Sequence, residues 1–194
     1  MSIWNFKAHI LALPAVLVLA ACDELPQTTG GGGAKALTQA SLSENSIRLA
    51  APNGYCIDRR SLRDRFALLG RCDTLGVIGT FAAVELAIIT VSTVPVTPES
   101  ATPSAAAMAA TKGQSNVVKT VSQDGLQFFQ LKGGGEQVEG VNDLYWRTAF
   151  VLNGQLVSIA LYAPSESGAV GPEGARILEG IVYATRTATE GISI

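Results

Sequence analysis

The cysteines and the histidine have the widest chemical repertoire of the side chains in this sequence, and they are few. The chain of 194 residues contains three cysteines, Cys22, Cys56 and Cys72, and one histidine, His9. Thiols act as nucleophiles, bind metals or pair in disulfides, and an imidazole is the usual base beside a catalytic Ser or Cys. Any such catalytic arrangement, and any histidine-ligated metal, would therefore have to use His9.

Residues 1–21 have the features of a bacterial signal peptide. Lys7 and the terminal amine supply positive charge, and the apolar run over residues 10–21 is too short to cross the ~30 Å hydrocarbon core of a bilayer. The run ends in Leu19-Ala20-Ala21-Cys22, which resembles the lipobox of bacterial lipoproteins. The alternative is an ordinary secretory signal in which the cysteine is incidental.

The lipobox resemblance implies that the chain is cut before Cys22 and that this residue carries a diacylglycerol on its sulfur and an acylated amine. Two or more acyl chains, palmitate among them, hold a protein stably on a bilayer. The implied location is the cell membrane, with a lipid anchor and the protein on the periplasmic side. Asp23 resembles the signal that retains enteric lipoproteins in the inner membrane, which favours that membrane.

Removal of residues 1–21 also removes His9, so that the mature chain has no histidine. This excludes Ser-His-Asp and Cys-His catalysis as well as histidine-ligated metals. Cys56 and Cys72 then remain in an oxidising compartment, where two thiols predict one disulfide. A redox dithiol is disfavoured because the C-x-x-C spacing is missing, and two ligands do not complete a metal site.

Two kinds of hydrolase chemistry need no histidine. Glycoside hydrolysis uses two carboxylates about 5–9 Å apart, and the acids with suitable spacing here are Glu136, Glu139 and Asp143. Surface loop acids are the simpler interpretation of these three residues. Ser-Lys catalysis needs a buried lysine beside a serine. The tether, loop and edge contexts argue against burial of the candidates Lys35, Lys112, Lys119 and Lys132.

Arginines crowd the segment 59–71, with three aspartates close by. As a basic patch they would face anionic headgroups or an acidic partner. As a solvated surface they would pair with the aspartates, at about 0–1 kcal/mol per pair, and this interpretation is favoured. Alternation along residues 145–152 predicts a buried Trp146 and an opposite face that could meet a partner. The possible interaction patch therefore comprises Arg59, Arg60, Arg63, Arg65 and Arg147.

Charge and length bound the class of protein. Removal of residues 1–21 takes away one of the 14 basic residues and none of the 16 acidic ones, so the mature chain is mildly acidic. Nucleic acid is therefore not an expected partner, since phosphate binding needs an excess of clustered cations. No motif predicts a metal or a cofactor. The segments are a signal peptide at 1–21, the lipidated Cys and a Gly-rich flexible tether at 22–46, one domain at 47–186 and a tail at 187–194.

Apolar spacing within the domain predicts its elements. Leu62, Phe66 and Leu69 share one helical face, which predicts a short helix over residues 61–69 after a capping Ser61. A β-branched run predicts a strand over 84–94. Hairpins are predicted over 117–131 and, around Asn153-Gly154, over 145–162. A final apolar stripe after Pro172 predicts a helix over 172–185.

These elements predict an α+β domain. A single antiparallel sheet of about 4–6 strands packs against the C-terminal helix, with one short helix near the N-terminal end of the domain. This order resembles the small domains of the PsbP and Mog1 type over about 120 residues, through the sequence that follows "VLNGQLVSIALYAP". The resemblance is topological and implies a fold, not a function.

The leading functional hypothesis is a non-enzymatic cell-envelope lipoprotein that acts through protein or lipid contacts. Its partners would be the membrane, reached through the lipid anchor, and an envelope protein. One alternative is a small-molecule or ion-binding module with a pocket on the second face of the sheet. Another is a histidine-free hydrolase that uses paired carboxylates.

Overall fold

The computed structural model describes residues 35–97, 102–110, 116–133 and 139–191. The signal peptide, Cys22, Asp23 and the first part of the predicted tether lie outside these residues, as do Lys112 and Glu136. Within the described ranges no helix is long and apolar enough to cross a membrane.

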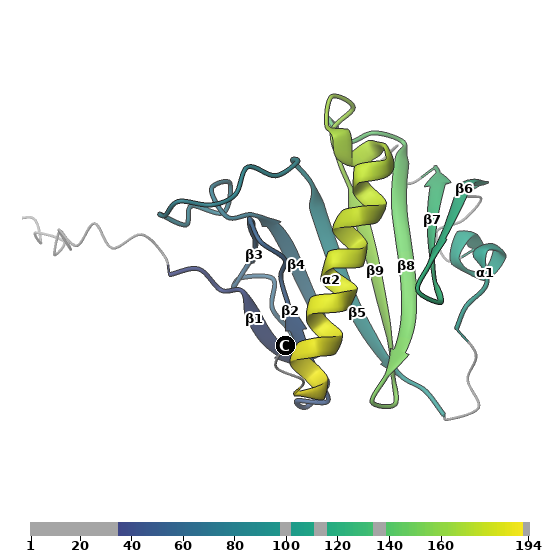
Figure 1. The fold of residues 1–194 in the computed structure, drawn as a ribbon, viewed down its shortest axis with the longest axis horizontal. Coiled ribbons are helices and arrows are strands. Elements are labelled where there is room, and N and C mark those ends of the chain that lie inside the picture. The colour runs from purple at the N-terminus through teal and green to yellow at the C-terminus, as the bar shows by residue number, and fades with distance from the viewer. Residues whose placement is uncertain (1–34, 98–101, 111–115, 134–138, 192–194) are drawn as a thin grey trace, which may run out of the picture. The chain divides into compact units, whose positions relative to one another are not determined.

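The described chain forms one large antiparallel sheet, one small sheet and two α-helices (Figure 1). The large sheet has seven strands in the order β3-β4-β5-β9-β8-β7-β6, and β1 and β2 form a separate hairpin. The elements are β1 (Gln39–Leu42), β2 (Ile47–Ala50), β3 (Tyr55–Ile57), β4 (Phe66–Arg71), β5 (Ile88–Pro95), α1 (Ala105–Ala110), β6 (Asn116–Gln123), β7 (Leu126–Lys132), β8 (Leu144–Leu152), β9 (Gln155–Tyr162), a 3-10 turn at Gly168–Val170 and α2 (Pro172–Glu190).

Two tight hairpins build the centre and one edge of this sheet, as the sequence predicts. Asn153 and Gly154 join β8 to β9, and both have positive φ, at 47° and 69°. Asp124 and Gly125 join β6 to β7 in the same way, with φ of 49° and 74°. Asn, Asp and Gly tolerate this conformation, which matches the twist of the flanking strands.

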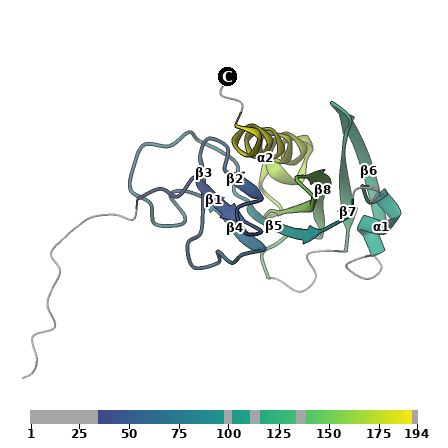
Figure 2. The same cartoon turned by 90° about the horizontal axis from the view of Figure 1, so that it is seen from below.

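Helix α2 and the β1–β2 hairpin pack on one face of the large sheet, here called the front face (Figure 2). The apolar stripe of α2, including Ile181 and Val182, is buried against the front-facing side chains of β8 and β9. The hairpin is tied to the same helix, since the amide of Arg48 donates to Thr189 Oγ1 at 3.0 Å. The front face therefore holds the main core.

Trp146 of β8 fixes the start of α2. Its indole Nε1 donates to the carbonyl oxygens of Val170 and Gly171, at 3.1 and 2.9 Å. Gly174, in the first turn of α2, packs so closely that a Cβ there would overlap the Trp146 ring. The buried tryptophan was predicted, and the structure confirms it.

The short helix predicted over residues 61–69 is wrong. Residues 58–65 form a loop, and β4 follows it, paired with β3 and β5. The Ser61 hydroxyl accepts from the amide of Leu68 and donates to the carbonyl of Asp58, so it braces this loop instead of capping a helix. Both a helix and a strand would bury Leu69, which is buried in the structure. The segment forms a strand because it pairs with a strand on each side.

The predicted sheet of about 4–6 strands is too small. The structure has seven strands in the large sheet, because the segment assigned to the short helix contributes β4 and because β3 pairs with it. Order also extends beyond the predicted domain limits. Strand β1 begins at Gln39, within the predicted tether, and α2 continues to Glu190, within the predicted tail. The side chain of Leu42 in β1 is fully buried.

Cys56 and Cys72 form the predicted disulfide, with their Cα atoms 4.9 Å apart. Cys56 lies in β3 and pairs across the ladder with Gly70 of β4. Cys72 directly follows β4, at the start of the long loop 72–87 that leads to β5. The disulfide therefore fastens the edge strand β3 and the base of this loop together.

Candidate functional site: the open sheet face

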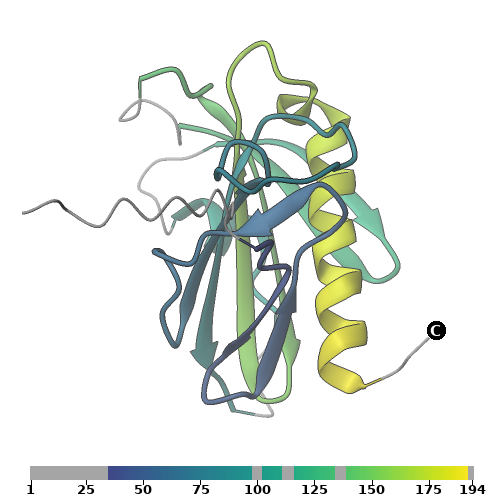
Figure 3. The ribbon, with the colours of Figure 1, turned by 90° about the vertical axis from the view of Figure 1, so that its left-hand side faces the viewer.

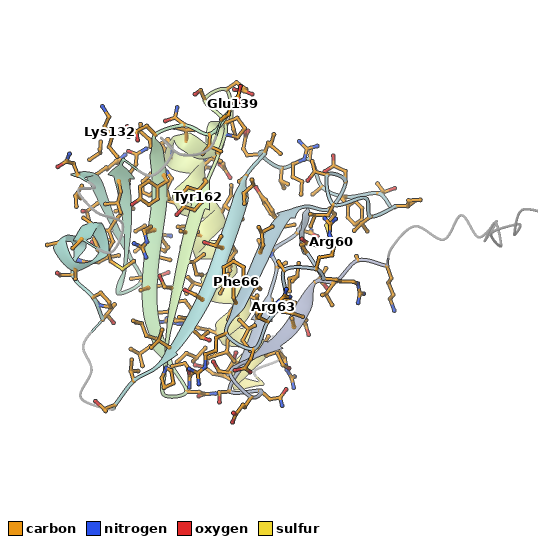
Figure 4. The ribbon with its side chains drawn as sticks, turned by 180° about the vertical axis from the view of Figure 1, so that it is seen from behind. Arg60, Arg63, Phe66, Lys132, Glu139 and Tyr162 are labelled. Carbon is orange, nitrogen blue, oxygen red and sulfur yellow. A yellow bond between two sulfur atoms is a disulfide. The ribbon has the colours of Figure 1, made fainter. Side chains whose placement is uncertain are left out.

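The rear face of the large sheet is covered over only part of its width. Met108 and Ala109 of α1 are buried against β7 and β8, in a second apolar cluster that includes Phe129 and Tyr145. No described helix or strand packs over the rear side of β4 and β5 (Figure 4), and on the rear side of β9 Leu156 and Tyr162 border the cluster under α1. We call this region the open sheet face, and its side chains are Phe66, Leu68, Ile88, Thr90, Ser92, Val94, Leu156, Ser158 and Tyr162.

Strict alternation along β5 produces this surface. Ile89, Val91 and Thr93 point into the core and are at most 2% exposed. The residues between and beside them point to the rear, where Ile88 is 44% and Val94 is 56% exposed. Large apolar side chains that stay exposed on a regular strand are informative, because a solvated strand face is normally polar.

The open sheet face combines apolar and hydroxyl groups and has no charged side chain among its nine residues. Ser92 and Ser158 are direct cross-strand neighbours at its centre, whereas Val94 and Leu156 pair at one end. At the other end Tyr162 stacks on Tyr145, with ring centroids 5.2 Å apart. Burial raises the pKa of Tyr162, although nearby Arg147 acts in the opposite direction, so its phenol is neutral at physiological pH.

Arg147 lies at the border between the covered and open parts of the rear face. Its Nη1 donates to the carbonyl of Met108 at 2.8 Å, and its Nη2 donates to Ser158 Oγ at 3.4 Å. Arg147 thus ties helix α1 to the sheet. It does not join the other arginines of the predicted patch, which all lie on the loop between β3 and β4.

That loop, residues 58–65, is here called the arginine loop. Arg60 pairs with Asp58 at 3.2 Å and Arg65 with Asp64 at 3.6 Å, as the favoured interpretation predicted. The Arg60 and Arg65 side chains nevertheless remain 86% and 58% exposed. Exposed pairs of this kind are weak, so both guanidinium groups stay accessible to other anions.

Arg63 connects the arginine loop to the open sheet face. Its amide donates to the carbonyl of Phe66 at 2.8 Å, and the amide of Phe66 donates back at 3.3 Å. Figure 4 shows Arg63 beside Phe66 at the border of the sheet. The Arg63 guanidinium, whose Nη1 donates to the carbonyls of Arg60 and Leu62, therefore stands at one border of an otherwise neutral surface.

The residues considered for hydrolysis are not arranged for it. Asp143 Oδ1 accepts from the amide of Gly133 at 2.8 Å, and Glu139 lies exposed in a turn. Lys35, Lys119 and Lys132 are all exposed, which is not the desolvated setting that activates a lysine. Glu136 and Lys112 lie outside the described residues.

A cleft that the sequence did not indicate lies where β7 separates from β8. The ladder between these strands ends at the pair Phe128 and Thr148, although both strands extend further. The resulting cleft has a volume of about 420 Å³ and is lined by residues that include Ser104, Gln127, Phe129, Ala149, Phe150 and Arg186. The alternation of apolar and polar residues shows which face of a strand a side chain lies on. It does not show where two neighbouring strands stop pairing, so the sequence gives no signal for this separation. The open sheet face was missed for a different reason, since Phe66 was assigned to a helix.

Comparison with known proteins gives structural likeness only. No family model matches the chain, and no curated protein sequence matches it. Among solved structures, a point mutant of the protein Mog1 aligns with 75% of this chain and 93% of its own length, at 11% identity and a TM-score of 0.45. The cyanobacterial PsbP (CyanoP) of Synechocystis sp. PCC 6803 aligns with 86% of this chain and 96% of its own, at 11% identity and a TM-score of 0.38. At these values neither likeness carries an argument about function.

Proposed function

We propose that this chain is a non-enzymatic, lipid-anchored protein of the bacterial cell envelope that binds a partner protein through the open sheet face. The observation that carries the proposal is the exposure of three large apolar side chains on one face of a regular sheet, Phe66 on β4 and Ile88 and Val94 on β5. Exposed apolar surface of this kind marks an interaction site, because leaving it in water is unfavourable.

The borders of the open sheet face indicate the chemistry of the partner. Thr90, Ser92 and Ser158 offer hydroxyl groups at the centre, and Arg63 stands along one side. A complementary surface has apolar side chains in its middle and carboxylates on one edge. Charge on such an edge steers the encounter and fixes the orientation more than it adds affinity.

The anchor completes the proposal. Cys22, outside the described residues, is the proposed lipidation site, and the domain is held at the periplasmic side of the cell membrane, with Asp23 favouring the inner membrane. The disulfide between Cys56 and Cys72 is compatible with an oxidising compartment. Tethering a binding domain at a surface raises its effective concentration for a partner in the same membrane.

Site-specific photocrosslinking in intact cells tests the proposed binding surface. A photoreactive residue replaces Ser92, at the centre of the open sheet face, and a control replaces Tyr183, exposed on α2. We expect one protein adduct from position 92 and none from position 183. Reversal of charge in Arg63→Glu should reduce the adduct several-fold, and Arg63→Gln, which can still donate to the carbonyls of Arg60 and Leu62, should reduce it less. Equal adducts from both positions, or insensitivity to the charge reversal, contradict the proposal.

The cleft between β7 and β8 supports a second candidate, a small-molecule binding module. Its volume of about 420 Å³ lies within the usual range for ligand sites, and it combines aromatic walls with the Arg186 guanidinium. Ala149→Leu would narrow the cleft, because the longer side chain would fill part of its volume. If a small molecule bound there, this variant would lose the ligand-induced rise in melting temperature, whereas Ser92→Ala would retain it.

A further inference from the structure

We infer that the end of the domain at which the described chain begins rests on a membrane surface rich in anionic headgroups. The inference deepens the proposed function and rests on its lipid anchor. It concerns a different surface from the open sheet face. Figure 3 shows this end of the domain, where β3, the arginine loop and loop 72–87 come together.

Two segments that are distant in the sequence place their cations together at this end. Lys35, Arg59 and Arg60 line one shallow cleft of about 230 Å³. Arg59 Nη2 donates to the carbonyl of Lys35 at 3.3 Å, which holds the entering chain against the arginine loop. The cleft contains a single carboxylate, that of Asp58, which pairs with Arg60. The cations therefore exceed the acids, and an exposed pair of this kind exchanges readily for a phosphate.

Loop 72–87 brings apolar side chains to the same end. Leu75 and Val77 line the cleft beside the cations, and the next residue, Ile78, is 75% exposed. Ile78, Gly79 and Thr80 are all exposed and lie outside any helix or strand, and we call this stretch the apolar tip. An exposed isoleucine beside several cations is typical of a surface that meets headgroups with its charges and the acyl boundary with its apolar tip.

The covalent structure fixes this loop in place. Cys72 is bonded to Cys56 of β3, and the amide of Val77 donates to the carbonyl of Cys72 at 3.0 Å. The amide of Leu75 donates to the carbonyl of Arg71 at 3.1 Å. The apolar tip is thus held a few residues from the disulfide, and its position relative to the arginine loop is set by the fold.

The length of chain between Cys22 and Lys35 favours a membrane, rather than a protein, as the surface that contacts the cationic end of the domain. If Cys22 carries lipid, residues 23–34 are all that separates it from Lys35, and a chain of that length reaches about 40 Å at full extension. The cationic end is therefore the end that must stay near the headgroups. The bilayer is always present at that distance, whereas a protein partner there would have to displace it.

Fluorescence of the reconstituted protein tests the inference. The lipidated full chain, carrying Ile78→Cys or the control Tyr183→Cys, is labelled with an environment-sensitive dye and inserted into vesicles of phosphatidylcholine with or without phosphatidylglycerol. With phosphatidylglycerol we expect a blue shift and loss of iodide quenching at position 78 but not at 183. Arg59→Glu with Arg60→Glu should abolish both effects, and Arg176→Glu on α2 should leave them intact.

The alternatives give different results. Vesicles that float with the protein while the dye at position 78 stays quenched by iodide overturn the docking inference and leave the anchor standing. Failure of the wild-type chain to float with vesicles of either composition overturns the anchor and with it the inference. Shielding of position 78 in whole cells but in neither vesicle identifies a protein occupant and also overturns the inference.

Discussion

Single residues decide how tightly the front face packs, and two glycines of α2 show the difference. Gly174 lies where a Cβ would overlap the Trp146 ring and the carbonyl of Ala169. Gly180 lies on a different side of α2, where a Cβ would make an ordinary van der Waals contact of 3.6 Å with Pro52. The sequence presents both as interruptions of a helix, and only the packing distinguishes them.

Gly174→Ala should therefore destabilise the domain by about 1–3 kcal/mol, because the added methyl overpacks a rigid site. Gly180→Ala should leave the stability unchanged or raise it by up to about 1 kcal/mol, because alanine favours the helix without a clash. Urea unfolding followed by circular dichroism measures both values. Equal effects of the two substitutions would show that the overlap at Gly174 is relieved without cost.

The ionisation of Tyr55 is coupled to folding. Its hydroxyl donates to the carbonyl of Glu85 at 2.6 Å, and burial, reinforced by the nearby charge of Glu85, raises the pKa of this phenol well above its ordinary value. Above about pH 10 the unfolded chain loses the phenolic proton while the folded chain keeps it. The stability that Tyr55 contributes is thus present below that pH and declines above it.

We expect the free energy of unfolding to fall as the pH rises above about 10. Tyr55→Phe should make this fall shallower while it lowers stability at neutral pH through loss of the hydrogen bond. Tyr183→Phe, at a side chain that is 58% exposed, should leave the profile unchanged. Identical alkaline profiles for Tyr55→Phe and the wild type would contradict this assignment.

At the scale of elements, the edge strand β3 depends on its disulfide. The strand has three residues and pairs with one neighbour in the large sheet. The residues Cys56 and Cys72 are separated by 16 positions, and closing a loop of that size stabilises a fold by about 3 kcal/mol in the chain-entropy model. The bond compensates for the few hydrogen bonds that so short a strand can form.

Cys56→Ser combined with Cys72→Ser should lower the free energy of unfolding by about 3 kcal/mol and expose loop 72–87 first. Hydrogen exchange measured by mass spectrometry should show the largest acceleration in β3 and in loop 72–87, with a smaller one in β8 and β9. Uniform acceleration across the whole sheet would show instead that the bond supports the entire fold.

The prediction of elements succeeded where local chemistry is sufficient. Asn153-Gly154 specifies a hairpin turn by its own backbone preferences, and the stripe after Pro172 suits only a helix. It failed over residues 61–69, where the spacing of Leu62, Phe66 and Leu69 satisfies a helix. Pairing of this segment with β3 and β5 outweighed the helical pattern, and no local signal contains that information.

The whole molecule presents two surfaces with different proposed tasks. The open sheet face lies on the rear of β4, β5 and β9, whereas the cationic end lies at β3 and the two loops beside it. Because they are different surfaces, contact with headgroups leaves Ile88 and Val94 available to a partner. The anchor proposed at Cys22 is the condition on which this arrangement depends.

Cys22→Ser should release the protein from the membrane fraction, because the thioether to lipid can no longer form. Metabolic labelling with a fatty acid should then give no labelled protein, and the variant should appear in the soluble fraction or remain unprocessed. The domain itself should melt at the same temperature, since residue 22 lies well before its first strand. Full membrane retention of a variant that has lost residues 1–21 would refute lipid anchoring.

The sequence by itself determined the proposed anchor motif, the Asn153-Gly154 hairpin and the C-terminal helix, because each depends on residues that are close together in the chain. It also determined the disulfide pair, because Cys56 and Cys72 are the only two cysteines after Cys22. Tertiary structure alone decided that Phe66 begins a strand, that Arg147 ties down α1 and that Lys35 meets Arg59. Those outcomes depend on pairing and packing between segments far apart in the chain, where several arrangements satisfy the same local pattern and only the buried surface of the whole domain selects one.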